Sequence, residues 1–480
     1  MTDGLRRPLV VVLGGGFTGA AVAYHLVRRI GRDAARIMVI EPRETLGAGL
    51  AYSTPEPAHR INVPAAKMSL DSAEPEQFAR WLEAANLPDD DPAAFEARGV
   101  FPQRRVFARY VAAMLAPFLA DGRIVHRRTR AERVARVAGG RFEIGLRDGL
   151  PVAADILVLA TTHPLPAVPE PLRPIATAPG FLADPYDIGA LGRVPRDARV
   201  LVLGNGLTAA DTVATLDRLG HRGPIVSLSR HGLRSRGHSP FPVEAFGDFA
   251  AEPSSTALAL LRRIRRTVER AAEAGVGWHA VLDAVRNQGG AIWQGLPEAQ
   301  QRRLVRRLRA SWDVHRFRIA PQVEAVLDRL TAEGRLRTFA ASLHSARETL
   351  AGIEVVFRQR GAASPRIETF DRVVNTTGPA HRDVIAAEPA RSLHAAGLLR
   401  LDAVGLGLAT AEDGRAIDLD GRLVPNLFVA GPLARGTFGE LMGLLEVTRY
   451  AEFVAAQIAA ATLRLATKAE RSDGEFARSG

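Results

Sequence analysis

The chain of 480 residues contains no cysteine. This absence excludes disulfides, thiolate metal sites, thiol nucleophiles and dithiol redox relays. Long hydrophobic runs are also missing: no segment of about 18 strongly apolar residues occurs, so we expect no membrane-spanning helix. No motif typical of zinc proteases or serine hydrolases occurs, which argues against metal-dependent and serine-hydrolase chemistry. We therefore expect a cytoplasmic enzyme that binds no metal.

Lysine is very scarce, and almost all of the basic charge is arginine, which leaves a net charge of +11. Such a charge can mark a nucleic-acid-binding protein, but here the arginines are spread along the whole chain. The abundance of alanine and glycine favours a GC-rich coding bias as the explanation. A hydrophobic content of 47% is typical of globular proteins. We predict neither a nucleic-acid nor a membrane partner.

The first motif is a glycine turn that follows a short apolar stretch, PLVVVL at 8–13. That stretch has the composition of a strand buried on both faces of a parallel sheet. In the turn, Gly14 permits a tight bend, Gly16 lets the backbone approach a pyrophosphate, and Gly19 allows close helix packing. A helical segment and a second strand follow, ending at Glu41, whose carboxylate can accept both ribose hydroxyls. The unit therefore predicts an adenine dinucleotide without a 2′-phosphate.

A second unit of the same kind occurs at 201–213 (LVLGNGLTAADTV), with Gly204 and Gly206 in a G-x-G-x-x-A turn. Its next strand ends at Ser229 and Arg230 instead of an acid. A carboxylate would repel a 2′-phosphate, whereas arginine can clamp it and serine can donate a hydrogen bond. We therefore predict NADPH at the second turn, the alternative being a degenerate duplicate that binds nothing.

Two such units on one chain predict a flavoprotein that binds FAD at the first turn and takes hydride from NADPH at the second. The two turns supply two sets of candidate cofactor-binding residues. The first set is Gly14, Gly16, Phe17, Thr18, Gly19, Glu41 and Pro42, and the second is Gly204, Asn205, Gly206, Leu207, Thr208, Ser229 and Arg230.

Three later stretches have features expected of a flavin-binding domain. DILVLATT at 155–162 and DRVVNTTGP at 371–379 are short apolar strands that end in small residues. LFVAGPLARGTFGEL at 427–441 has the form of a strand and glycine turn that approach a flavin ring. We therefore expect the chain to leave the first domain near residue 165 and to return near 370. The cofactor contacts expected from the last two stretches are Gly378, Gly431, Pro432 and Leu433.

These observations predict an α/β fold with two Rossmann-like dinucleotide-binding domains, the NADPH domain being inserted into the FAD domain. The expected boundaries are 1–165 and 370–465 for the FAD domain, 195–245 and 322–369 for the NADPH domain, 246–321 for a helical insert and 466–480 for a polar tail. In the insert, Ser254, Ser255 or Thr256 can cap a first helix, and further helices fit 278–287 and 298–310. Their arginine-rich faces are expected to be solvated.

The sequence resembles one bacterial group of two-dinucleotide flavoproteins, the FAD/NAD(P)-binding proteins akin to flavin-dependent N-hydroxylating monooxygenases. The resemblance rests on GAGLAYSTPEPAHRINVPAAKMSL at 47–70, SRHGLRSRGH at 229–238 and WDVHRFRIAP at 312–321, and it covers nearly the whole chain. Near the C-terminus GTFGELMGLLEVTR replaces the aromatic–Glu run of the group, which leaves the substrate open.

The resemblance implies that NADPH reduces FAD, that O₂ forms a flavin hydroperoxide, and that a small amine-containing substrate is oxygenated. It also implies that Asn62, Met68 and Ser69 lie near the isoalloxazine, with Asn62 a candidate catalytic residue. Two alternatives stay open: an oxidoreductase that passes hydride without inserting oxygen, and a non-catalytic FAD-binding module whose helical insert docks a partner protein. The absence of cysteine argues against a disulfide reductase.

Four further residues are candidates from their chemistry. Arg104 or Arg105 can contact flavin phosphate or ribose, and surface salt bridging is the alternative for either; we select Arg105. His315 and Arg316 are candidate catalytic residues, because histidine transfers protons near neutral pH and arginine can hold a carboxylate. The alternative for His315 is an ordinary structural hydrogen bond.

Overall fold

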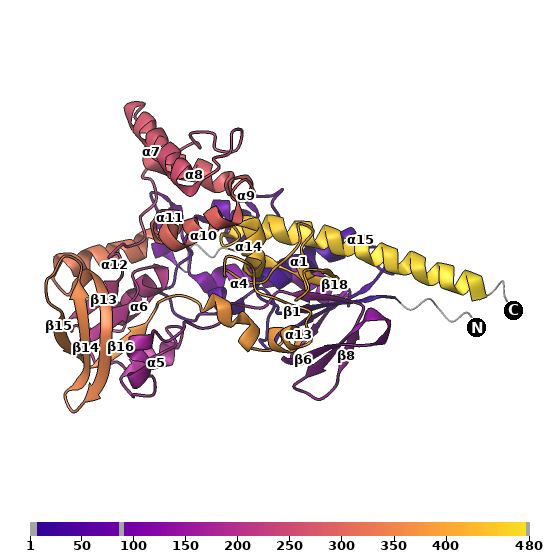
Figure 1. Cartoon of the computed structure of the whole chain (residues 1–480), viewed down its shortest axis with the longest axis horizontal. Helices are drawn as coiled ribbons and strands as arrows, with labels where there is room; N and C mark the ends of the chain where they lie inside the picture. Colours follow the sequence, from indigo (N-terminus) through magenta and orange to yellow (C-terminus); the bar gives the residue numbers. More distant parts are fainter. Residues whose placement is uncertain (1–6, 86–90, 477–480) are drawn as a thin grey trace.

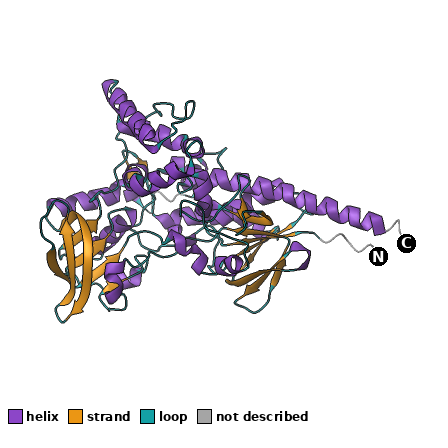
Figure 2. Ribbon diagram, viewed as in Figure 1, coloured by secondary structure: helices purple, strands orange, loops and turns teal. Residues whose placement is uncertain are grey.

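The computed structural model describes residues 7–85 and 91–476. Two main sheets lie on opposite sides of the molecule, and helices flank both of them (Figures 1 and 2). Helices α7 (Ala257–Glu273) and α8 (Trp278–Asn287) project away from both sheets, and the long α15 (Leu444–Phe476) extends past the first sheet (Figure 1). The predicted α/β architecture is therefore confirmed.

The first sheet has six strands in the order β17-β18-β9-β1-β2-β5. They are β1 (Leu9–Leu13), β2 (Arg36–Ile40), β5 (Ile124–Arg127), β9 (Ile156–Leu159), β17 (Arg415–Ile417) and β18 (Leu423–Val429). The five strands from β18 to β5 are parallel, and β17 pairs antiparallel at the edge. Strands β1 (LVVVL) and β9 (ILVL) are wholly apolar and buried, because helices cover a parallel sheet on both faces.

The first sheet is covered by α1 (Phe17–Arg29), which packs between α4 (Arg104–Ala120) and α15. Smaller elements complete this domain. They are α2 (Gly49–Tyr52), α3 (Gln77–Ala84), α13 (Ala390–Ala395), α14 (Arg435–Phe438), the hairpin of β3 (Phe95–Glu96) and β4 (Gly99–Val100), and the antiparallel sheet of β6 (Ala131–Arg136), β7 (Phe142–Leu146) and β8 (Val152–Ala154).

The second sheet has seven strands in the order β10-β16-β11-β12-β13-β14-β15. They are β10 (Phe181–Leu182), β11 (Val200–Leu203), β12 (Ile225–Ser229), β13 (Leu336–Thr349), β14 (Gly352–Gln359), β15 (Arg366–Phe370) and β16 (Arg372–Asn375). Strands β10, β16, β11, β12 and the start of β13 are parallel, and β13, β14 and β15 continue as an antiparallel meander. Helices α5 (Ile188–Gly192), α6 (Leu207–Arg218) and α12 (Pro321–Ala332) belong to this domain.

The parallel parts of the two sheets are equivalent strand by strand, and hydrogen bonds set the correspondence. The amide of Gly14 donates to the carbonyl of the residue before Glu41 at 2.9 Å, and the amide of Gly204 donates to that of the residue before Ser229 at 2.8 Å. Glu41 and Ser229 therefore occupy the same position in the two units. The acid of the first unit is replaced by serine in the second, as the sequence predicts.

The segment 371–379 belongs to the second sheet, so its expected place in the FAD domain is wrong. Strand β16 lies between β10 and β11. A Cβ at Gly204 would lie 2.6 Å from the carbonyl oxygen of Thr376, just as one at Gly14 would lie 2.6 Å from that of Ala160. DILVLATT and DRVVNTTG are thus the same element of the two domains, because each glycine turn needs a neighbouring strand end that it can approach closely.

The two crossings between the domains run side by side. Pro166 and Pro379 form an antiparallel bridge, and the amide of Ala380 donates to the carbonyl of Leu165 at 3.3 Å. The side-chain amide of Asn375 donates to the carbonyl of Ala167 at 3.1 Å. The chain therefore leaves the first domain near residue 165 and returns after residue 379, whereas its return was expected near 370.

The helical insert consists of α7, α8, α9 (Gly289–Gln294), α10 (Glu298–Arg307) and α11 (Arg309–Arg316), all within 246–321. Thr256 is the residue that caps α7, since its hydroxyl accepts from the amide of Ala259 at 3.1 Å. The helix predicted over 298–310 is divided at Leu308 into α10 and α11. The WDVHR part of the third signature stretch therefore lies on a helix.

The described part of the expected polar tail is helical, because α15 continues to Phe476. Residues 477–480 of that tail, and residues 1–6 of the expected first domain, lie outside the described residues. No helix in the described part of the chain is long and apolar enough to cross a membrane.

Gly19 provides a test of the first turn. A Cβ there would overlap the carbonyl oxygen of Gly14. We expect Gly19→Ala to lower the free energy of unfolding by about 1–3 kcal/mol, the usual range for overpacking. Gly31→Ala is the control, since a Cβ at Gly31 would have nothing within 4 Å and should cause no loss. Urea denaturation of both variants makes the comparison, and equal losses would contradict it.

Candidate active site

The first glycine turn has the geometry of a dinucleotide cradle. No side chain caps the N-terminus of α1, so its first amides stay available to a pyrophosphate. Glu41 is 4% exposed, and its carboxylate accepts from the amide of Gly15 at 2.9 Å and from Arg43 at 3.0 Å. A carboxylate has about four acceptor positions, so Glu41 retains capacity for a ribose hydroxyl.

Two of the predicted segments lie directly against this turn. The amide of Gly47 donates to the carbonyl of Gly15 at 2.8 Å, and a Cβ at Gly16 would lie 3.2 Å from the Cα of Gly49. Gly431 lies against Thr18, because a Cβ there would approach the threonine side chain to 2.6 Å. The structure thus brings segments from both ends of the chain to the first turn.

The residues predicted near the flavin ring have partners within the protein. Met68 is buried in the hydrophobic core. The carbonyl of Ser69 accepts the hydroxyl of Thr448 at 2.9 Å, and the carbonyl of Asn62 accepts the ring Nε2 of His238 at 2.9 Å. Their contacts with a flavin stay predictions.

The second glycine turn also opens an uncapped helix, α6. The side chain of Asn205 is buried there, and its Nδ2 has no hydrogen-bond partner. The hydroxyl of Ser229 accepts from the amide of Gly232 at 3.0 Å. Arg230 is exposed, and within the described part of the chain its side chain has no ion pair or hydrogen bond. The guanidinium of Arg230 is therefore free to meet a 2′-phosphate.

One face of α6 docks the second domain onto the first. Asp211 forms an ion pair of 2.7 Å with Arg104 of α4, and the two side chains are only 9% and 13% exposed. One turn further on, the hydroxyl of Thr215 lies 3.1 Å from the ring Nε2 of His59. Arg218, at the end of the helix, pairs with Glu56. Helix α6 therefore packs on the loop formed by the first signature stretch, residues 47–70.

Arg104 and Arg105, the two adjacent arginines considered as flavin contacts, therefore differ in their interactions. Arg104 is committed to Asp211 and also donates to the carbonyl of Arg60 at 2.9 Å. Arg105 is exposed on α4. A cofactor contact of Arg105 stays a prediction.

The predicted catalytic role of Arg316 requires a guanidinium that is free to bind a substrate. The guanidinium of Arg316 is instead already paired within the protein. Its buried guanidinium donates to Glu440 at 2.6 Å and to Glu446 at 3.3 Å, and Glu446 also pairs with Arg286. These ion pairs hold the insert against the segment that leads into α15. The ring of His315 is likewise engaged within its own helix, since its Nδ1 donates to the carbonyl of Ser311 at 2.7 Å.

A different group of basic side chains meets where the three parts of the chain come together. We call His163, Arg309, His381 and Arg435 the buried basic cluster, after the nitrogen atoms that are buried within it; Arg435 is buried as a whole, and the other three residues are partly exposed. His163 follows β9, His381 follows β16 at the start of a 3₁₀ helix (His381–Ala386), Arg435 begins α14, and Arg309 begins α11. The two histidine rings lie edge to face with centroids 5.0 Å apart. Arg309 donates to the Nε2 of His381 at 2.9 Å.

Several nitrogen atoms of this cluster are buried without a partner. They are both ring nitrogens of His163, the Nδ1 of His381 and the Nε of Arg435. Arg435 is 7% exposed, and no ion pair or hydrogen bond of its side chain exists among the described residues. Since buried polar groups are nearly always satisfied in native proteins, atoms of this kind are typical of a site that water or a ligand completes.

Electrostatics in the cluster reflect burial and crowded positive charge. Burial, together with the charges of Arg435 and Arg309, lowers the pKa of His163 to about 4. The same causes lower the pKa of His381 to about 2. Burial and the nearby Arg309 lower the pKa of Arg435 to about 10 against the opposite effect of Asp313, Glu440 and Asp402, so its guanidinium stays charged at neutral pH. Both histidines are therefore neutral there.

The sequence carried a partial signal for this cluster. His163 and His381 each come shortly after a strand that ends in small residues, where α/β proteins bind ligands. Arg435 lies inside the glycine turn that was expected near the flavin. Arg309 carried no signal, because it is one of many arginines on amphipathic helices.

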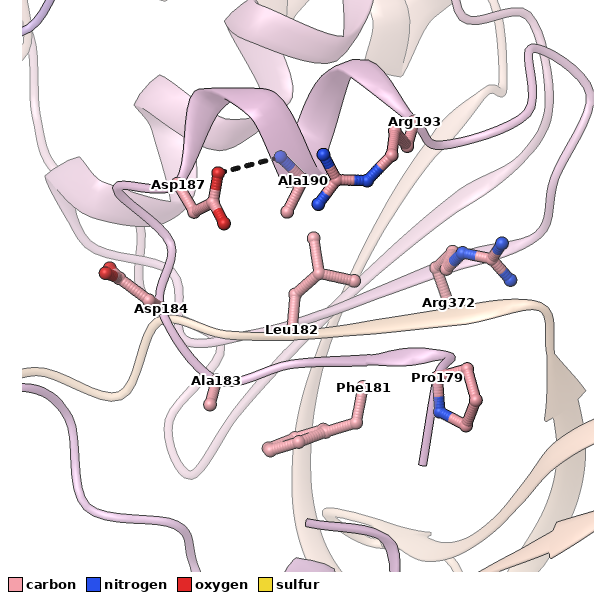
Figure 3. Close-up of a pocket in the computed structure, with 9 residues that line it drawn as sticks. All are labelled: Pro179, Phe181, Leu182, Ala183, Asp184, Asp187, Ala190, Arg193 and Arg372. Carbon is pink, nitrogen blue, oxygen red and sulfur yellow. Dashed lines mark hydrogen bonds between the residues drawn. The ribbon is translucent and has the colours of Figure 1, made fainter. Parts of the chain in front are cut away.

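A surface hollow of about 510 Å³ lies elsewhere, between β10 and α5 (Figure 3). Asp184, Asp187, Arg193 and Arg372 contribute its charged groups. Asp187 is used structurally, since it accepts from the amide of Ala190 at 2.8 Å. No residue predicted for the cofactors or the substrate lines this hollow.

Two equivalent parallel sheets with uncapped glycine turns define an α/β protein with two dinucleotide-binding domains. Comparison with known families agrees: a model described as FAD-NAD(P)-binding matches residues 11–164. The chain therefore contains an FAD-NAD(P)-binding domain, as predicted from its first glycine turn. No curated protein matches the chain.

Solved structures show the same fold at low sequence identity. Ornithine hydroxylase from Pseudomonas aeruginosa aligns with a TM-score of 0.63 and 14% identity over 95% of this chain and 100% of that one. L-lysine 6-monooxygenase from Pseudomonas syringae aligns with 0.61 and 17% over 95% and 99%. An ornithine N-hydroxylase from Kutzneria sp. 744 aligns with 0.62 and 15% over 94% and 99%. The chain has the fold of these N-hydroxylating flavoproteins, which confirms the predicted resemblance at the level of the fold.

The ion pair between the domains gives one prediction. Arg104→Leu would leave Asp211 buried without a partner, which typically costs about 3–5 kcal/mol. We expect a corresponding loss in the free energy of unfolding, measured by urea denaturation. Arg105→Leu removes an exposed arginine of the same helix and should change it by less than about 0.5 kcal/mol. A similar loss in both variants would contradict the assignment.

The lowered pKa of His163 gives a second prediction. In the unfolded chain a histidine titrates near pH 6.5, whereas His163 in the fold titrates near 4. Between these values the unfolded state binds more protons, so stability falls as the pH drops from 6.5 to 4. His163→Asn should reduce the fall in Tm over this range. His344→Asn, which changes an exposed histidine of β13, should keep the wild-type fall; identical curves for all three proteins would refute the prediction.

Proposed function

We propose that the protein is an NADPH-dependent FAD monooxygenase that oxygenates a small amine-containing molecule with O₂. The observation that carries the proposal is the pair of equivalent glycine turns, which end in Glu41 in one domain and in Ser229 and Arg230 in the other. Enzymes with this fold support the reaction type, since they include an ornithine hydroxylase and an L-lysine 6-monooxygenase. The Kutzneria structure combines reduced FAD, NADP⁺ and L-ornithine.

The residues at the first turn fit FAD. The backbone near Gly14 and Gly16 is open to a pyrophosphate, and Glu41 presents a buried carboxylate toward a ribose. The residues at the second turn fit NADPH, because Arg230 and Ser229 suit a 2′-phosphate that a carboxylate would repel. When bound, the flavin supplies the redox and oxygen chemistry.

The chain itself contributes position and a defined proton state. The docking of α6 on the first domain orients the second turn. Because its pKa is about 4, His163 is neutral at physiological pH and presents one N–H donor and one bare nitrogen acceptor.

The decisive experiment measures flavin reduction and product together. The purified protein should carry FAD, and NADPH should bleach its yellow absorbance faster than NADH does. Screening amines and amino acids should then reveal one for which NADPH use matches the hydroxylated product. A protein without FAD, or one that NADPH does not bleach, would refute the proposal. NADPH use that yields only peroxide with every compound would favour an oxidoreductase that does not insert oxygen.

Arg230 allows a specific test of the second site. We expect Arg230→Ala to raise the KM for NADPH by about 10–100-fold, because an arginine–phosphate contact is a strong charge-assisted one, and to leave the KM for NADH nearly unchanged. Arg222→Ala is the matched control, since it removes another exposed arginine just before the opposite end of β12. Equal KM values for NADPH in both variants would show that Arg230 does not bind the 2′-phosphate.

A further inference from the structure

We propose that the buried basic cluster recognises a carboxylate of the substrate and that Arg435 thereby selects an amine with a net negative charge. This inference rests on the proposed function, because it specifies the substrate class of that reaction. It distinguishes this protein from the ornithine hydroxylase and the L-lysine 6-monooxygenase of the same fold, since ornithine and lysine are cationic amino acids.

The first step is the position of the cluster. His163 and Arg435 follow two neighbouring strands of the first sheet, β9 and β18, and His381 follows β16 of the second. Ligands of open α/β sheets bind outside the carboxyl ends of such strands. The cluster therefore lies where the ligands of both domains and a substrate can meet.

The second step is the balance of charge. The neighbouring arginines have carboxylate partners: Arg316 has Glu440, Arg286 has Glu446, and Arg309 lies 3.3 Å from Asp313. Arg435 is 7% exposed and its side chain has no ion pair or hydrogen bond in the described part of the chain, and the carboxylates whose charge acts on it, Asp313, Glu440 and Asp402, are engaged by other donors. A buried charge without a partner is strongly unfavourable, so an anion from outside the protein is the expected complement.

The third step concerns the hydrogen-bond donors that the cluster presents to a ligand. Since Arg309 donates to the Nε2 of His381, the proton of that neutral ring sits on its Nδ1. That Nδ1–H and the Nε–H of Arg435 are both buried donors without acceptors. Donors on a planar guanidinium suit a carboxylate, which accepts at two oxygens.

The cluster also disfavours cationic ligands. Of the carboxylates whose charge acts on Arg435, Asp313 is engaged by Arg309 and Glu440 is engaged by Arg316. Asp402, whose charge also acts on Arg435, accepts from the backbone amides of Val404 at 2.8 Å and Leu406 at 2.9 Å, so each of these three carboxylates already has a donor. A diamine would meet two arginines there, whereas an acidic amine would neutralise one of them.

The test uses the FAD-loaded holoenzyme and small probes without a reacting amine. Succinate should bind saturably and perturb the flavin absorbance, whereas succinamide and 1,4-diaminobutane of similar length should bind at least tenfold more weakly. Inorganic phosphate is a further arm and should bind more weakly than succinate, since the site is assigned to a carboxylate. Tighter binding of the diamine or of phosphate, or no binding of succinate, would overturn the inference.

Variants then assign the binding to the residue. Arg435→Gln should weaken succinate at least tenfold while the ratio of FAD to protein stays at the wild-type value. Arg382→Gln, which changes an exposed arginine next to His381, should bind succinate like the wild type. Unchanged affinity in Arg435→Gln would refute the role, and so would loss of FAD from a folded Arg435→Gln protein, because the arginine would then serve the cofactor.

The binding of the probes to the wild-type holoenzyme still tests the inference even if Arg435→Gln fails to fold. Bleaching by NADPH is measured on the same holoenzyme without any probe. Bleaching and amine oxygenation without succinate binding would refute the carboxylate site alone. Succinate binding without bleaching would refute the proposed function alone.

Discussion

A buried ion pair between Arg104 and Asp211 governs how the two nucleotide-binding domains face each other. Both side chains are largely buried, so neither charge can lose its partner without a large free-energy cost. The contacts of Thr215 and Arg218 extend the same face of α6 along the first domain. Because α6 also begins at the second glycine turn, the docking that satisfies Asp211 orients the second cradle as well.

The buried basic cluster is a consequence of that arrangement. Once α6 is seated, the strand ends of both sheets and the first turn of α11 share one region, and His163 comes to lie against His381. Ion pairs of Arg316 and Arg286 with the segment before α15 lock the insert over the same region. The carboxylates of Asp313, Glu440 and Glu446 form ion pairs there, and in our proposal Arg435 is the charge that a ligand meets.

Much of the fold could be predicted because its determinants are local. A tight turn, an uncapped helix and a two-sided buried strand each impose a residue pattern over fewer than about twenty positions. The replacement of Glu41 by Ser229 could be predicted for the same reason, since both stand at the end of a strand in the same register. The segment 371–379 was misplaced because β9 and β16 obey the same local rule, and composition alone does not tell which sheet a strand joins.

The sequence by itself determined the two glycine turns, the acid and the base that distinguish them, and the presence of a helical insert. Only the tertiary structure decided which arginines of this region form ion pairs and which one, among the described residues, forms none. Arg316 and Arg435 are alike in sequence terms, but the first lies against two glutamates, whereas the second has no carboxylate partner among the described residues. Pairing of charges depends on long-range packing, and no local pattern encodes it.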